Sequence, residues 1–155
     1  MIVTITPNPA VDEVYTVDEF KPGRWYRSNK VVRSPGGRGV NVSIILKQLG
    51  YDSVATGFLA GHSGGYIKDD LILRGITTSF VNIKGENRTN TFVKDTAEKI
   101  ETAIMEEGPE APDDAVCRFF RTLDHLVLRA TAVHMGGSLP PGLPEDFYRR
   151  TVDRV

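Results

Sequence analysis

Residues 34–41 read Ser34-Pro35-Gly36-Gly37-Arg38-Gly39-Val40-Asn41, and this glycine-rich stretch decides how the whole chain is interpreted. Glycine allows positive φ and lets a ligand approach the main chain. The stretch opens a predicted helix, whose first N–H groups and dipole favour a bound anion. Arg38 can pair with phosphate or carboxylate oxygens, and the Asn41 amide suits sugar hydroxyls. A turn that binds a small ligand and a turn that binds nothing both fit these residues.

Two common phosphate-binding fingerprints do not match this stretch. A dinucleotide fingerprint needs a small third residue, but the run that starts at Gly37 places Val42 there. The next predicted strand also lacks an acidic residue where it ends, at Leu59. A Walker A loop needs Gly-Lys-Ser or Gly-Lys-Thr, and the sequence contains neither. The glycines therefore do not indicate either nucleotide-binding motif.

Strand-like and helix-like segments alternate around the glycine-rich stretch. Met1–Thr6 is an apolar run closed by Pro7-Asn8-Pro9, which predicts a buried strand and a turn. Ser53–Leu59 predicts a second short strand. The helix between them is predicted to bury one face, formed by Val42, Ile45, Leu46 and Leu49. Strand, helix and strand joined by short links favour a parallel sheet covered by helices, an α/β fold.

The same alternation continues toward the end of the chain. Ser63 is predicted to cap a second helix that runs through Ile67 and Leu71 to Gly75. A third helix opens at Pro112, followed by the buried strand Ala132–Met135. The third helix is predicted to bury Val116, Phe119, Phe120 and Leu123. A last helix starts near Pro144 and runs to the end of the sequence.

Several segments with partly polar alternation lie outside this pattern. Val11–Phe20 and Trp25–Ser34 are predicted to pair as an exposed hairpin. Thr77–Ile83, Thr89–Lys94 and Ile100–Met105 are predicted to form meander strands outside the main sheet. The sequence therefore predicts a second, smaller β structure.

Composition limits the classes of partner. The formal net charge is −1, from 19 basic and 20 acidic residues, so no broad field attracts nucleic acid or an anionic membrane. No signal peptide or long apolar segment is apparent, which predicts a cytosolic protein. Cys117 lies in an apolar helical pattern and is predicted to be a buried structural thiol. The three histidines lack metal-ligand spacing, so no metal site is predicted.

Four motifs, in order, resemble one family over essentially the whole chain. They are Thr6–Asp12, Pro35–Val42, Arg88-Thr89-Asn90 and Gly137–Gly142. The resemblance is to the 1-phosphofructokinase and tagatose-6-phosphate kinase branch of the PfkB–ribokinase carbohydrate kinases. It implies a ribokinase-like three-layer α/β/α sandwich, incomplete, with a small β-sheet lid. Residues 1–155 would be the amino-terminal half of that domain, with lid segments at about 11–33 and 77–105 inserted in the α/β core.

The resemblance also implies a substrate site. Asp12 would accept hydrogen bonds from sugar hydroxyls, and Arg88 would reach the phosphate that the substrate already carries. Arg38 stands where this branch usually has lysine. The remaining implied substrate-binding residues are Gly36, Gly37, Asn41, Asn90 and Ser138. In this family the lid often forms a homodimer contact, which gives Trp25 and Tyr26 an interface role and lets Arg24 and Arg27 approach the partner's phosphate.

The implied reaction is transfer of phosphate from MgATP to a phosphorylated ketose. Fructose 1-phosphate is the first expected substrate, followed by tagatose 6-phosphate and fructose 6-phosphate; a nucleoside is less expected. Family kinases are about twice as long as this chain and keep a G-A-G-D segment, an N-x-x-E segment and most ATP contacts downstream. The sequence matches neither segment, so no catalytic residue is assigned and this chain alone is expected to be inactive. The alternative is a non-catalytic sugar-phosphate-binding fragment or half of a split kinase.

Overall fold

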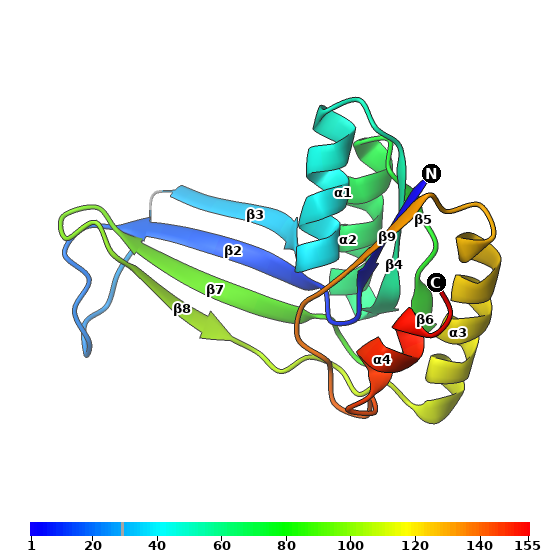
Figure 1. Ribbon diagram of the computed structural model, residues 1–155. Helices are drawn as coiled ribbons and strands as arrows, with labels where there is room; N and C mark the ends of the chain where they lie inside the picture. Colours follow the sequence, from blue (N-terminus) through cyan, green and yellow to red (C-terminus); the bar gives the residue numbers. More distant parts are fainter. Residues whose placement is uncertain (29) are drawn as a thin grey trace.

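The computed structural model describes residues 1–28 and 30–155, which form an α/β part and a long β arm (Figure 1). The α/β part is built on a parallel sheet with the strand order β5-β4-β1-β9, in which β6 also pairs with β4. These strands are β1 (Ile2–Thr6), β4 (Ser53–Ala60), β5 (Thr77–Thr78), β6 (Val81–Ile83) and β9 (Ala132–Met135). The predicted α/β class is confirmed.

Helices cover both faces of this sheet. The helices are α1 (Arg38–Gln48), α2 (Gly61–Leu73), α3 (Asp113–Val127) and α4 (Phe147–Val152). One core cluster joins Val3 and Ile5 of β1 to α3 and α4, and a second joins β4 to α1 and α2. The result is the three-layer α/β/α arrangement visible in Figure 1.

The two faces of β1 are chemically different. Val3 and Ile5 pack into the apolar cluster beneath α3, whereas the alternate residues Thr4 and Thr6 face α1. The Thr4 and Ser43 hydroxyls lie 2.6 Å apart, and the backbone N–H of Val40 donates to Thr6 Oγ1 at 2.8 Å. Buried hydroxyls thus fix α1 on β1 through hydrogen bonds that satisfy both elements.

The α1 helix buries a different face from the one predicted. Its buried residues are Gly39, Val40 and Ser43, while Ile45 and Leu49 are 52% and 66% exposed. A β-carbon added at Gly39 would lie 2.7 Å from the Ile5 carbonyl oxygen. The helix therefore approaches β1 through its smallest residues, and this close approach decides which face is buried.

The start of α2 and the environment of Cys117 also correct the sequence predictions. Ile67 and Leu71 are buried as predicted, but Ser63 is not the cap of α2. Glu86 instead accepts hydrogen bonds from the Ser63 and His62 backbone N–H groups, 3.0 Å each, and these bonds lower the pKa of Glu86. Cys117 is exposed, because α3 turns Ala115, Val116, Phe119, Phe120 and Leu123 inward and leaves position 117 on its outer face.

The β arm, called the lid below, is a four-stranded sheet that projects from the α/β part (Figure 1). Its order is β3-β2-β7-β8, formed by β3 (Lys30–Gly36), β2 (Ala10–Val17), β7 (Arg88–Asp95) and β8 (Glu101–Met105). The outer pairs are antiparallel and the central pair, β2 with β7, is parallel. The predicted hairpin of the first two lid segments is present.

Two details of the lid differ from the prediction. Residues 77–83 form β5 and β6, which pair with β4 in the main sheet, so placing them in the lid is wrong. Both strands lie at the edge of the main sheet, beside β4. The strand predicted at Trp25–Ser34 starts instead at Lys30; Asn29, within that prediction, lies outside the described residues.

Asp95 holds the far end of the lid together. Its carboxylate accepts backbone N–H bonds from Phe20 at 2.7 Å, Ala97 at 2.9 Å, Glu19 at 3.1 Å and Glu98 at 3.3 Å. Burial alone would raise the pKa of Asp95, but these N–H donors outweigh it and hold the pKa below the ordinary value of 3.8. One carboxylate thus joins the loop after β2 to the turn after β7.

We expect the lid end to loosen in Asp95→Asn, because an amide offers one acceptor oxygen instead of two charged ones. Because the pKa of Asp95 is lowered in the folded chain, the charged carboxylate stabilises the lid end at pH values above 3.8. This stabilisation is lost as the pH falls below 3.8 and the carboxylate is protonated, so the wild-type lid should then loosen in the same way. The anisotropy of Trp25, the single tryptophan, is the measurement, and it should fall in both cases.

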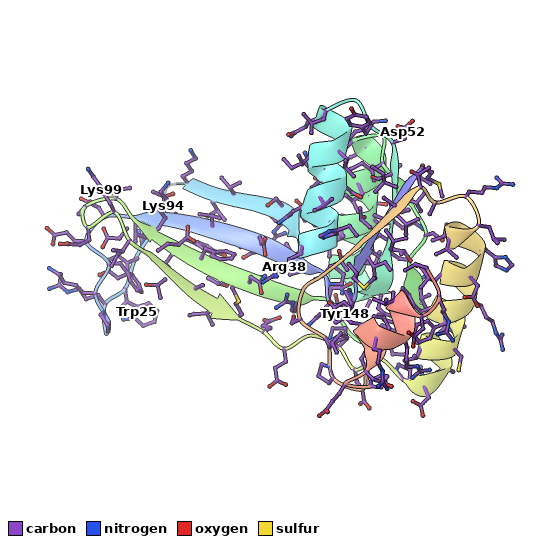
Figure 2. The ribbon with its side chains drawn as sticks, in the orientation of Figure 1. Trp25, Arg38, Asp52, Lys94, Lys99 and Tyr148 are labelled. Atoms are coloured by element: carbon purple, nitrogen blue, oxygen red, sulfur yellow. The ribbon has the colours of Figure 1, made fainter. Side chains whose placement is uncertain are left out.

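The matched control is Asp52→Asn, which removes a charge at an 88% exposed side chain. Figure 2 shows Asp52 on the α/β part and Trp25, Lys94 and Lys99 at the far end of the lid. Unchanged anisotropy in Asp95→Asn would show that the carboxylate does not hold this end of the lid.

Candidate functional site

Three of the predicted residues meet where the lid joins the α/β part. Asp12 and Asn90 lie opposite each other on β2 and β7, and Asn90 Nδ2 donates to Asp12 Oδ1 at 2.7 Å. A β-carbon added at Gly36 on β3 would lie 2.6 Å from the same oxygen. The Asn90 Oδ1 atom is buried and has no hydrogen-bond partner among residues 1–28 and 30–155. The cluster therefore presents hydrogen-bond acceptors.

Gly37 sets the direction of α1 beside this cluster. It is the N-cap residue, with φ of 114°, a conformation that glycine adopts without strain. A β-carbon there would lie 3.3 Å from Pro9 Cα, so the turn packs closely on the segment that follows β1. The amino end of α1 thus lies at the carboxyl end of the sheet, where ligands bind in open α/β folds.

Arg88 supplies the positive charge of this region. It is half-buried at the start of β7, and its Nε donates to the Asn8 carbonyl oxygen at 3.2 Å, while Nη1 reaches the Glu106 carbonyl oxygen at 3.5 Å. Burial lowers the pKa of Arg88, and the charge of Asp12 acts in the opposite direction. Arg88 forms no ion pair with any residue that the structure describes. A desolvated cation without a carboxylate partner suits an anionic ligand.

Asn8 belongs to the site although the sequence motifs assign it no role. Its side chain is only 3% exposed, and Nδ2 donates to the Glu107 carbonyl oxygen at 2.7 Å and to Ser138 Oγ at 3.3 Å. The signal in the sequence is its position between two prolines at the carboxyl end of β1. We call residues 106–111, which Asn8 contacts, the strap.

Ser138 lies on the loop that follows β9. The Tyr148 hydroxyl donates to the Gly137 carbonyl oxygen at 2.8 Å, and the Ala111 N–H of the strap donates to the Pro141 carbonyl oxygen at 2.8 Å. These bonds hold both ends of the loop while Ser138 itself stays exposed. Ser138 joins the cluster through Asn8 rather than through Asp12.

The side chains of Arg38 and Asn41 form no hydrogen bond with this cluster, or with another predicted site residue, in the part of the chain that the structure describes. Both residues are exposed on the first turn of α1. Arg38 lies against the loop after β9, since a β-carbon on Gly136 would be 3.4 Å from its Cδ. Burial raises the pKa of Tyr148, and the positive charge of Arg38 partly offsets that change. Figure 2 labels Arg38 and Tyr148.

The lid arginines lie apart from this cluster. Arg24 and Arg27 are exposed on the loop between β2 and β3, and Trp25 between them is fully exposed at the far end of the lid (Figure 2). The structure therefore separates them from Arg88 within one chain. Tyr26 is fixed in this loop, because its hydroxyl donates to the Glu19 carbonyl oxygen at 2.9 Å.

An open cleft of about 1360 Å³ lies beside the cluster, between the turn after β6, the strap and the start of α3. It shares Arg88 with the predicted site and does not include Asp12, Gly36 or Ser138. Its charged side chains are Lys84, Glu86, Arg88, Glu106, Glu107, Glu110, Asp114 and Arg118. The guanidinium of Arg88 is thus reachable from solvent through this cleft.

The described residues contain neither a metal-binding cluster nor a membrane-spanning helix. The described ranges, 1–28 and 30–155, contain no group of three or more His, Cys, Asp or Glu side chains arranged to hold a metal ion. In the same ranges no helix is long and apolar enough to cross a membrane.

The chain is similar to known carbohydrate kinases in sequence and in fold. Residues 6–153 match the family described as pfkB family carbohydrate kinase. A protein from Thermotoga maritima described as "Possible 1-phosphofructokinase" is 39% identical over 99% of this chain and 49% of its own, with a TM-score of 0.94. Phosphofructokinase-2 from Escherichia coli in complex with fructose-6-phosphate is 24% identical over 98% of this chain and 50% of its own, with a TM-score of 0.89.

A ribokinase from Giardia lamblia shares the fold more distantly, at 18% identity and a TM-score of 0.78 over 98% of this chain and 49% of its own. All three structures share the predicted ribokinase-like fold, and the family match over residues 6–153 with the 39% identical Thermotoga maritima protein confirms the predicted family. The chain spans about half the length of the solved structures that it matches.

Proposed function

The chain belongs to the pfkB family of carbohydrate kinases, and we propose its function on that basis. It carries the sugar-binding half of an ATP-dependent kinase that phosphorylates a ketose phosphate. Fructose 1-phosphate, giving fructose 1,6-bisphosphate, is the first choice, and the name of the Thermotoga maritima protein supports it. Tagatose 6-phosphate and fructose 6-phosphate follow.

The observation that carries this proposal is the half-buried Arg88 without an ion-pair partner among the described residues, beside acceptors on Asp12 and Asn90. Hydroxyl groups of a sugar can donate to those acceptors. A phosphate can accept from the guanidinium, with the charge-assisted bonds that arginine favours. One ligand that has hydroxyls at one end and phosphate at the other satisfies both sets of groups.

Each site residue then has a proposed role. Asp12 and Asn90 accept from sugar hydroxyls, and the backbone of Gly36 and Gly37 approaches the ring closely. Arg88 binds the phosphate already present. Three further residues contact the substrate at its edges and are Arg38, Asn41 and Ser138.

The family reaction uses ATP and Mg²⁺, which supply the phosphoryl group and neutralise its charge. The described ranges contain no group of three or more His, Cys, Asp or Glu side chains that could hold a metal ion, and no step is assigned to Mg²⁺ here. We propose that the contribution of this chain is to bind and orient the sugar phosphate. Orientation of the acceptor hydroxyl is itself a large part of phosphoryl-transfer catalysis.

We expect no ADP release above background when the purified 155-residue chain is mixed with MgATP and each of the three ketose phosphates. The reason is that the sequence has no match to the family's G-A-G-D or N-x-x-E segment. Circular dichroism confirms that the sample is folded. Turnover with any one sugar would contradict this expectation and name the substrate.

A second candidate is a sugar-phosphate-binding protein without catalysis, or one half of a split kinase. The share of each matched structure that this chain covers, 49% or 50%, favours considering it. Mixing the chain with a separately expressed second half distinguishes the two. Restored ADP release supports the split kinase, and binding without restored turnover supports the non-catalytic protein.

Arg88→Ala is expected to weaken fructose 1-phosphate binding about thirtyfold and to leave the affinity for fructose nearly unchanged. Hydrogen bonds to charged groups contribute about 1.5–3 kcal/mol, and only the phosphorylated sugar makes them here. Isothermal titration calorimetry with the two sugars is the measurement.

The matched control for this variant is Arg118→Ala. Arg118 lines the same cleft, but its guanidinium already donates to the Asn82 carbonyl oxygen at 3.1 Å and to the Asp114 carboxylate at 3.2 Å. Binding of both sugars should be preserved in this variant. An equal loss of fructose and fructose 1-phosphate affinity in Arg88→Ala would place the phosphate somewhere else.

We also propose a homodimer through the lid. The lid carries an apolar groove of about 330 Å³, lined mainly by Tyr15, Val17, Phe20, Tyr26, Val31 and Val93. Exposed apolar surface of this kind favours association. In such a dimer Arg24 and Arg27 of one copy would approach the phosphate held by the other. Sedimentation velocity tests the proposal, and a monomer at assay concentration would remove it.

A further inference from the structure

We infer that Asn8 is the positioning residue for the phosphate end of this site: it directs the Ser138 hydroxyl and the Arg88 guanidinium toward the ligand without contacting the ligand itself. The inference rests on the proposed function. It adds a residue to which the sequence motifs assign no role.

Three hydrogen bonds meet at Asn8. Its Nδ2 donates to Ser138 Oγ at 3.3 Å and to the Glu107 carbonyl oxygen at 2.7 Å, and its main-chain carbonyl oxygen accepts from Arg88 Nε at 3.2 Å. The side chain is buried, at 3% exposure. Both of the groups proposed to face the phosphate end are therefore held by one residue.

The direction of the bond to Ser138 has a chemical consequence. Because Ser138 Oγ accepts a hydrogen from Asn8, its own single hydrogen is free to donate outward. Arg88 has donors only. The end of the site that these two residues form is thus made of donors, which suits the oxygens of a phosphate and disfavours another donor.

The strap gives Asn8 a second route to Arg88. Arg88 Nη1 reaches the Glu106 carbonyl oxygen, and Asn8 fixes the next residue, Glu107, at its own carbonyl oxygen. A β-carbon added at Gly108 would lie 3.1 Å from Asn8 Cγ, so the strap packs directly on the Asn8 amide. Loss of that amide frees the Glu107 carbonyl group and so loosens the neighbouring Glu106, whose carbonyl oxygen accepts from Arg88 Nη1; the bond from Arg88 Nε to the Asn8 main chain remains.

The burial of Asn8 itself favours a role in positioning over a role in stability. Its Oδ1 is buried with no hydrogen-bond partner in the described part of the chain. A buried acceptor left unpaired is costly, and such groups are unusual unless the arrangement serves another purpose. Here the same amide supplies the only side-chain hydrogen bond that Ser138 receives from residues 1–28 and 30–155.

The test measures the affinities for fructose 1-phosphate and fructose by calorimetry and competition. The proteins are the wild-type chain, Asn8→Ala, Asn8→Asp, Ser138→Ala and the double variant Asn8→Ala/Ser138→Ala. Gln48→Ala is the control, since Gln48 is an exposed amide at the other end of α1. Asn8→Ala should lower the affinity for fructose 1-phosphate about tenfold and the affinity for fructose less than about twofold. The reason is that the hydrogen bonds weakened are those to the charged phosphate, which fructose lacks.

Asn8→Asp keeps the size of the side chain and so remains informative if Asn8→Ala does not fold. It removes both N–H donors and adds a negative charge next to Ser138, at the proposed phosphate end, so its loss of fructose 1-phosphate affinity should exceed that of Asn8→Ala. In the Ser138→Ala background, the further effect of Asn8→Ala should shrink, because the two residues act as a unit.

Three results would overturn the inference. In the first two, the wild-type chain binds fructose 1-phosphate. Either Asn8→Ala and Asn8→Asp lower the affinities for both sugars by the same factor, or the effects of the Asn8 and Ser138 substitutions on affinity add fully. The third is failure of the wild-type chain to bind fructose 1-phosphate at all. That result overturns the proposed function first and the inference with it, so the two failures can be told apart.

Discussion

Gly36→Ala is expected to lower the affinity for a ketose phosphate about a hundredfold while the chain stays folded. A β-carbon at position 36 would lie 2.6 Å from Asp12 Oδ1 and overlap the rest of that carboxylate. The carboxylate must move, which breaks its 2.7 Å bond with Asn90 Nδ2. Loss of hydrogen bonds to a charged group costs about 1.5–3 kcal/mol, and that range includes a hundredfold change in Kd.

The fold should survive this change because the backbone at Gly36, unlike that at Gly37, does not have a positive φ. Gly65→Ala is the control, since Gly65 lies in α2 with no atom near an added β-carbon and needs no positive φ. Calorimetry should show normal binding for Gly65→Ala. Normal binding by Gly36→Ala would mean that the Asp12 carboxylate does not contact the sugar.

Gly57→Ala is expected to have the largest effect on stability. Gly57 lies in the fully buried strand β4 with φ of 144°, and an added β-carbon would overlap the Thr6 carbonyl oxygen and lie 2.8 Å from its carbonyl carbon. Strained φ and overpacking each cost about 1–3 kcal/mol, so we expect a loss on the order of 4 kcal/mol in the free energy of unfolding. Urea denaturation is the measurement.

Gly50→Ala separates the two causes. Gly50 also has a positive φ, of 83°, but no atom of the described residues lies within 4 Å of an added β-carbon. Its substitution should therefore cost only the strain of a left-handed backbone, about 1–2 kcal/mol. Equal unfolding midpoints for Gly50→Ala and Gly57→Ala would contradict the close approach of β1 and β4 at Thr6.

Three strands of the main sheet, β1, β4 and β9, and all four helices could be predicted because their signals are local. The apolar run of β1, the glycine-rich turn before α1 and the apolar face of α3 each lie within a few residues. Such patterns report burial without any knowledge of distant partners. The lid residues Asp12 and Asn90 came instead from ordered motifs, and the structure brings them within 2.7 Å of each other.

The misplaced features depend on contacts between distant segments. Periodicity favours Ile45 and Leu49 as the buried side of α1, but the hydroxyls of β1 and the small residues Gly39 and Ser43 decide otherwise. Nothing near Val81 in the sequence indicates that this residue pairs with Phe58. A period of two states only that a strand has two faces, and its neighbour is set by the tertiary fold.

Asn8 was missed for the same reason. Its partners Arg88 and Ser138 are 80 and 130 residues away along the chain. A single asparagine between prolines is equally typical of an ordinary turn. Only the tertiary arrangement distinguishes a turn residue from one that connects two parts of a binding site.

The parallel pairing of β2 with β7 has a consequence for the order of folding. Asp12 and Asn90 are 78 residues apart, and α1, β4 and α2 lie between them. Closing so long a loop has an entropic cost, which prior formation of the intervening elements reduces. We therefore expect the centre of the lid to assemble after the sheet, so that the binding site is completed last. On this expectation, ligand binding indicates that the rest of the chain is already folded.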